Sequence, residues 1–179
     1  MTFQRTLIAA CAAGLMATTA FAMTPAEHKA AKEGISADYK MNKEKCDALK
    51  ANAKDICEEE AEAAEKNARA ELEFSASGKP ADAMKVQTVK ADGAFEVAKE
   101  RCDDLSGNAK DVCNKEAKAA HVAAIAAAKS PKASAEDRAE AKEDVNEAKY
   151  KAAAEKCDTL SGDAKTACIQ AAKTAHGQR

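Results

Sequence analysis

The sequence predicts an all-α protein made of three tandem disulfide-stapled helical hairpins, with about six helices in total. The first observation behind this prediction is composition. Alanine makes up about a quarter of the 179 residues, while Trp is absent and only two Tyr occur. Such usage is typical of long helices and disfavours a sheet. The second observation is a motif with two cysteines that occurs three times, as "EKCDALKANAKDIC", "ERCDDLSGNAKDVC" and "EKCDTLSGDAKTAC".

The N-terminus has the pattern of a secretory signal peptide. Arg5 is the only charged residue among the first 26, an apolar run follows it, and small residues stand at Ala20 and Ala22. We therefore expect a signal peptide at residues 1–22, cleaved after Ala22, because its apolar core is too short to span a bilayer. The competing interpretation is a lipid-attachment signal at Cys11. The mature chain is expected in the periplasm, without a transmembrane segment.

Six cysteines remain once Cys11 is removed with the signal peptide, and an even number in an exported chain predicts disulfides. In a continuous helix, two residues eleven apart would be separated by about 16 Å, which no disulfide spans. A helical hairpin brings them together, so the disulfide interpretation requires a bend inside each motif. Reversible redox chemistry of the thiols is the competing interpretation. The local, three-fold repeated pairing that we predict is Cys46–Cys57, Cys102–Cys113 and Cys157–Cys168.

Turn-forming residues support a bend inside each motif. Gly107 and Gly162 stand where a helix C-cap favours a positive φ, and the residues after them, Asn108 and Asp163, are good N-caps for a second helix. The first motif has Asn52 at the same place but no glycine before it. We expect the same turn there, with a continuous helix as the alternative.

The repeat spacing divides the mature chain into three hairpins. The first cysteines lie 56 and 55 residues apart, an aromatic residue precedes each by seven positions, and a leucine follows each by three. These spacings put aromatic, cysteine and leucine on one helical stripe. Gly, Pro and Ser between the repeats predict interhelix turns. The sequence leaves open whether the helices form a bundle or an elongated array. The expected hairpins are 23–78, 79–132 and 133–179, with helices at about 25–49, 53–74, 80–105, 109–129, 134–160 and 164–176.

Charge and motif content disfavour several classes of function. The chain carries 28 basic and 30 acidic residues, a balance that argues against a nucleic-acid partner. The histidines, His28, His121 and His176, are expected at exposed helix positions. Neither a clustered Cys/His metal motif nor a phosphate-binding loop is present in the sequence. We therefore expect neither enzymatic activity nor a metal or cofactor.

The "CDxLSGNAKDxC" hairpins and the stretch "SGKPADAMKVQTVKA", behind a signal peptide, resemble a group of uncharacterised exported proteins of Gram-negative proteobacteria. These proteins are rich in Ala, Lys and Glu and are sometimes labelled as cell envelope biogenesis or TolA-like proteins. The resemblance covers the mature chain and implies a periplasmic location. It brings no functional residues with it.

Together, these patterns favour a non-enzymatic structural or protein-interaction module of the cell envelope. Its partners would be envelope proteins, and self-association is left open. The alternative is a periplasmic metal or small-ligand buffer, or a stress-response protein, that uses the cysteine hairpins.

Overall fold

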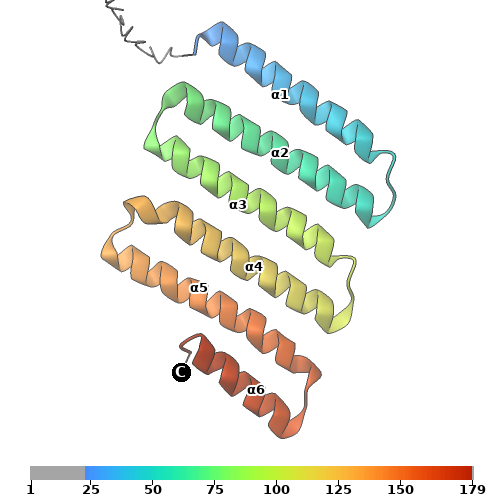
Figure 1. Cartoon of the computed structure of the whole chain (residues 1–179), viewed down its shortest axis with the longest axis vertical. Coiled ribbons are helices and arrows are strands. Elements are labelled where there is room, and N and C mark those ends of the chain that lie inside the picture. Colours follow the sequence, from blue (N-terminus) through green and yellow to red (C-terminus); the bar gives the residue numbers. More distant parts are fainter. Residues whose placement is uncertain (1–22, 179) are drawn as a thin grey trace, which may run out of the picture.

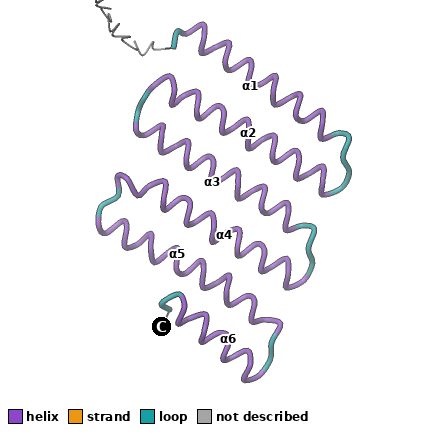
Figure 2. Tube along the Cα trace, viewed as in Figure 1, coloured by secondary structure: helices purple, strands orange, loops and turns teal. Residues whose placement is uncertain are grey.

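The computed structural model describes residues 23–178; the predicted signal peptide, with Cys11, lies outside this range. The described chain folds into six α-helices and two short 3₁₀ turns and contains no strand (Figures 1 and 2). The elements are α1 (Pro25–Cys46), α2 (Asn52–Ser77), α3 (Pro80–Cys102), α4 (Gly107–Lys129), η1 (Ser130–Lys132), α5 (Ala135–Glu155), η2 (Lys156–Thr159) and α6 (Gly162–Ala175).

The helices form a single layer (Figure 1). Each helix runs antiparallel to its sequence neighbours and packs against the helix before it and the helix after it. The turns that join α1 to α2, α3 to α4 and α5 to α6 lie along one edge of the layer, and the two turns between hairpins lie along the other. The helical-hairpin architecture is therefore confirmed, and the hairpins form an elongated array and not a bundle. No helix between residues 23 and 178 combines the length and apolar content needed to cross a membrane.

The interior of this layer is thin. Most buried side chains are alanines, and the largest that are fully buried are the first cysteines of the three motifs, Cys46, Cys102 and Cys157. Alanine removes little apolar surface from water, and burial stabilises by about 25 cal/mol per Å². The helices α2 and α3 approach each other closely at Gly93, where an added Cβ would lie 2.8 Å from the Ala63 Cβ. Close packing of small residues thus takes the place of large apolar side chains.

The first helix of each hairpin ends earlier than expected. We expected the first helix of each hairpin to continue through the leucine three positions after the cysteine, but α1 and α3 end at the cysteine itself and α5 ends two residues before it. The backbone N–H of each leucine donates to the carbonyl of that cysteine, at 2.9–3.0 Å, and closes a tight turn. Leu49, Leu105 and Leu160 therefore leave the helical stripe and are 42–43% exposed.

The glycines of the bend do adopt a positive φ, but they begin the second helix instead of ending the first. Gly107 and Gly162 both have φ of 56°. The first hairpin makes the same turn without glycine, because Ala51 takes φ of 50° at the equivalent place. It is the only non-glycine residue with positive φ in the described chain. A residue with a Cβ is strained in this region of backbone space.

Elsewhere, ordinary helix signals fix the termini. Thr24 with Glu27, and Ser134 with Asp137, form capping boxes at the starts of α1 and α5. Gly78 ends α2 in the left-handed conformation that glycine favours at this place, and Pro80 occupies the first position of α3.

The Ala51→Gly substitution should stabilise the protein. Glycine relieves the cost of a positive φ, which is about 1–2 kcal/mol for a residue with a Cβ, and part of that gain is offset by the greater freedom of glycine in the unfolded chain. We expect the free energy of unfolding in urea to rise by about 1 kcal/mol. The matched substitution Gly107→Ala should lower it by a similar amount. Equal stability of all three proteins would contradict the strain assigned to Ala51.

Candidate interaction surface

The six cysteines of the described chain form the three predicted disulfides. Cys46–Cys57, Cys102–Cys113 and Cys157–Cys168 have Cα–Cα distances of 5.5, 5.6 and 5.8 Å. In each pair the first cysteine is fully buried at the bend, and the second is half-buried about one and a half turns into the following helix. The thiols are consumed in these bonds, which hold the two helices of each hairpin at one end.

A second contact crosses each bend beside the disulfide. The aspartate after the first cysteine pairs with a lysine in the first turns of the second helix: Asp47–Lys54 at 2.8 Å, Asp103–Lys110 at 3.0 Å and Asp158–Lys165 at 2.9 Å. Sequence reasoning missed these pairs, although Asp and Lys recur at fixed distances from the cysteine in all three motifs. Each pair is exposed to solvent, so its contribution to stability is small.

The asparagines of the motif join neighbouring hairpins instead of capping their own helices. The Asn52 side-chain amide donates to the backbone carbonyl of Glu100 at 2.8 Å, and that of Asn108 donates to the carbonyl of Glu155 at 2.9 Å. The helices α2, α4 and α6 have no side-chain N-cap hydrogen bond. The N-cap role predicted for Asn52, Asn108 and Asp163 is therefore wrong. The accepting carbonyls lie at the C-terminal ends of α3 and α5, where helices leave carbonyls unsatisfied.

Acid–base pairs lie beside these hydrogen bonds. They cross the same contacts between neighbouring hairpins, which we call the seams. Arg101 pairs with Glu60 between α3 and α2 at 2.6 Å, and Lys156 pairs with Glu116 at the equivalent place in the next repeat, also at 2.6 Å. A further pair, Lys90–Glu71 at 2.6 Å, lies farther along the α2–α3 seam. Each hairpin thus meets the next through a repeated set of polar contacts around small residues.

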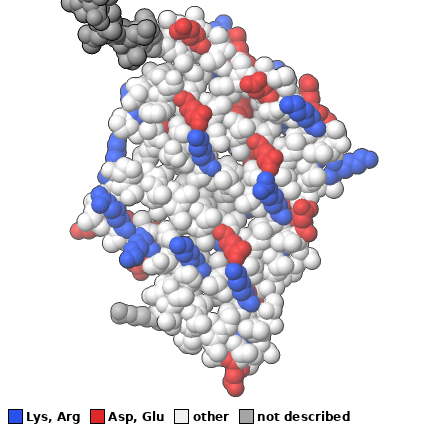
Figure 3. Space-filling view, viewed as in Figure 1, with Lys and Arg blue, Asp and Glu red and all other residues white. Residues whose placement is uncertain are grey.

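Figure 3 shows one broad side of the layer, where uncharged side chains cover most of the surface. Along the middle of this view acidic side chains lie beside basic ones, and further basic side chains lie at its lower left and at its right edge. Between α2 and α3 the surface is hollowed, with a cavity volume of about 620 Å³ whose lining includes Ala64, Ala94 and Val97. The equivalent residues of the next repeat have the same helical spacing from its acid–base pair, so they continue this surface onto α4 and α5. We call it the alanine face; its uncharged members are Ala64, Ala94, Val97, Ala98, Ala120, Ala123, Ala127, Val145 and Ala153.

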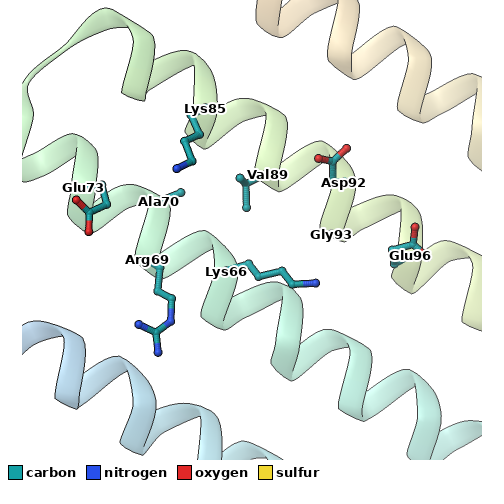
Figure 4. Close-up of a pocket in the computed structure, with 9 residues that line it drawn as sticks. All are labelled: Lys66, Arg69, Ala70, Glu73, Lys85, Val89, Asp92, Gly93 and Glu96. Carbon is teal, nitrogen blue, oxygen red and sulfur yellow. The ribbon is translucent and has the colours of Figure 1, made fainter.

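The opposite side of the layer is charged. A hollow of about 370 Å³ between α2 and α3 is lined there by basic and acidic side chains around Ala70, Val89 and Gly93 (Figure 4). The sticks in Figure 4 come from both helices, with Lys66, Arg69 and Lys85 next to Glu73, Asp92 and Glu96. Charges of both signs alternate around this hollow, so it presents no surface of a single sign.

The histidines were expected at exposed positions, and all three are partly covered instead. The side chain of His121 is 16% exposed; its Nε2 lies 2.6 Å from Asp92 Oδ1, and its ring stacks on Phe95 with centroids 4.8 Å apart. His28 lies 3.3 Å from a Glu73 oxygen. His176 stands at the end of α6, half-buried. Within residues 23–178, no three His, Cys, Asp or Glu side chains are grouped so as to hold a metal ion.

No family model, curated protein or solved structure matches this chain.

Replacing Asn108 should loosen the seam between the second and third hairpins. Asn108→Ala removes the hydrogen bond to the Glu155 carbonyl, worth about 1 kcal/mol. Asn108→Asp should cost more, because a carboxylate then faces a carbonyl oxygen. The control is Asp163→Asn, because no hairpin follows Asp163 in the described array. This substitution should change the unfolding free energy by only a few tenths of a kcal/mol, through the helix dipole. Urea unfolding of the four proteins measures this order, and a smaller cost for Asn108→Asp than for Asn108→Ala would contradict it.

The pair across the first bend should give an acid-dependent contribution to stability. The hydrogen bond from Lys54, and then its charge, lower the pKa of Asp47 below its ordinary value of 3.8. The folded state therefore holds this proton less tightly than the unfolded state does. The stabilisation is present above about pH 4 and is lost as the pH falls through the folded-state pKa. Thermal melts from pH 6 to pH 2 should show Asp47→Asn less stable than the parent at pH 6 and equal to it at pH 2. A constant difference across this range would contradict the assignment.

Proposed function

We propose that the protein is a non-enzymatic structural or protein-interaction module of the cell envelope, and that the alanine face is the surface through which it binds a partner protein. The observation that carries the proposal is the form of that face. It extends across neighbouring hairpins, its uncharged members are small apolar side chains, and acid–base pairs lie where one hairpin meets the next. Around these pairs, such a surface can approach another protein closely without leaving a buried unpaired charge.

The location in this proposal is the periplasm, after removal of residues 1–22. Three disulfides in one chain are typical of an oxidising compartment. They also suit a module that must hold its shape with little buried apolar surface, because each closes a loop of about a dozen residues and contributes on the order of 3 kcal/mol in the chain-entropy model. The alternative of a metal or ligand buffer using the cysteine hairpins gains nothing from the structure, since those sulfurs are bonded to each other.

Site-specific photo-crosslinking in cells tests the proposal. A photoreactive residue at Ala94 or at Ala120, on the alanine face, should give discrete adducts with another envelope protein. The same residue at Lys85 or Lys118, on the charged side of α3 and α4, should not. Ala98→Glu should remove the adduct from position 120 while leaving the melting temperature and the helical circular dichroism unchanged.

Mass spectrometry then separates adducts with another protein from adducts between two copies of this chain, and gives the N-terminus of the exported form. Equal crosslinking from both sides of the layer, or none from the alanine face, would overturn the proposed surface. A chain that keeps residues 1–22 and fractionates with the cytoplasm would overturn the proposed location.

A further inference from the structure

Within residues 23–178, one edge of α1 has no neighbouring helix. In α3, the stripe that receives the preceding hairpin includes Val86 and Gly93, which are buried, and Val97, which is half-buried. The residues 56 positions earlier in α1 are Ala30, Ala37 and Met41, and all three are exposed. Met41 is 52% exposed, the most of any large apolar side chain in the described residues. We call this stripe, with Gly34 between Ala30 and Ala37, the open edge.

Gly34 gives an independent reason to expect a neighbour at this edge. A glycine inside a helix costs about 1 kcal/mol relative to alanine. In α3 the structure explains Gly93, because a Cβ there would collide with Ala63 of the neighbouring helix. No atom of residues 23–178 lies within 4 Å of a Cβ placed on Gly34. The missing side chain at Gly34 therefore allows a close contact only where another helix approaches α1.

The other end of the array is built differently. The last helix, α6, has 14 residues where α2 has 26 and α4 has 23. Two seam residues are replaced there: Asp163 stands in the place of Asn52 and Asn108, and Ala171 in the place of Glu60 and Glu116. Repeat arrays end in units whose outer side lacks the features that bind a further repeat. The outer side of α6 lacks these features, so it ends the array. The open edge of α1 does not end the array in this way.

We infer that the open edge binds a second copy of this chain, with the two α1 helices antiparallel about a two-fold axis at the middle of the helix. This arrangement continues the antiparallel order of the layer. It sets Gly34 opposite Ala37 of the second copy, and Met41 opposite Ala30 of the second copy, so that small side chains meet small ones and the large one lies over alanine. An antiparallel pairing about the midpoint of Pro25–Cys46 uses the whole helix.

Charge complementarity selects a second copy over an unrelated helix. Lys45 occupies the position of Arg101 and Lys156, which pair with a glutamate of the preceding hairpin. In the two-fold arrangement it lies beside Glu27 of the second copy. On the other side of the helix, Glu33 comes within a turn of Lys40 of the second copy. The symmetry makes each of these pairs twice, as an isologous interface requires.

Association at this edge is expected to be reversible. One pair of helices of about 33 Å gives an interface at the small end of the specific range, so the dissociation constant should be micromolar. Analytical ultracentrifugation of the purified, oxidised protein, from about 1 to 300 µM, should show a monomer passing to a dimer and no larger species. Gly34→Leu should shift the dissociation constant upward by at least tenfold while raising the melting temperature of the monomer, because leucine is the better helix former and the site is empty. The control Gln170→Leu, on the outer side of α6, should leave dimerisation unchanged.

A charge exchange identifies the pairing itself. Glu33→Lys and Lys40→Glu should each weaken the dimer, and the double variant should restore it, because the exchanged charges again face each other in the second copy. A protein that stays monomeric at 300 µM overturns the inference. So does a dimer that Gly34→Leu does not affect, or a double variant that associates no better than either single one. None of these readouts involves the alanine face, so this inference stands or falls separately from the proposed function.

Discussion

The disulfide across each bend is the constraint on which the rest of the structure depends. An alanine-rich helix pair has little apolar area to bury, and the only fully buried side chains of any size in the described residues are the first cysteines of the three motifs. The bond therefore has two roles, because it both fills the interior at the bend and limits the freedom of the unfolded chain. It also fixes where the second helix starts relative to the first. This fixed register brings an Asp carboxylate oxygen within 2.8–3.0 Å of a Lys Nζ across every bend.

Once each hairpin is fixed, the array follows from contacts between nearest neighbours alone. The asparagine of one bend binds the carbonyl at the end of the next hairpin's first helix, 47 or 48 residues away. A glutamate just over two turns farther along binds a basic residue there. No contact of this kind links the first hairpin to the third. Stability in such an array is close to a sum of repeat and interface contributions. The absence of both seam residues in the third hairpin, at Asp163 and Ala171, then ends the array without affecting the hairpin itself.

The parts of this structure that sequence reasoning predicted are those decided by local geometry. Helicity, the need for a bend between cysteines eleven residues apart, and the resulting pairing all follow from helix dimensions and disulfide reach. The turn at Ala51 was also predicted, although its residue type opposes it. The errors concern competition between local and distant partners. Asn108 is a good N-cap by type, but the unsatisfied carbonyl of Glu155 is the partner it binds. The alanine face and the single layer depend on the register between hairpins, which no pattern within one motif determines.

The seam contacts also decide the character of the surface that they cross. Arg101 and Lys156 are placed at the ends of helices, where they would otherwise present isolated positive charge, and pairing with Glu60 and Glu116 removes that field from the broad side of the layer. On the opposite side, charges of both signs remain spread around the hollow of Figure 4. A chain with nearly equal numbers of acidic and basic residues thus places acid–base pairs among small apolar side chains on one side of the layer and charges of both signs around the hollow on the other. The interactions that join the hairpins are those that make one side suitable for close contact with another protein, so the architecture and the proposed binding surface have the same physical origin.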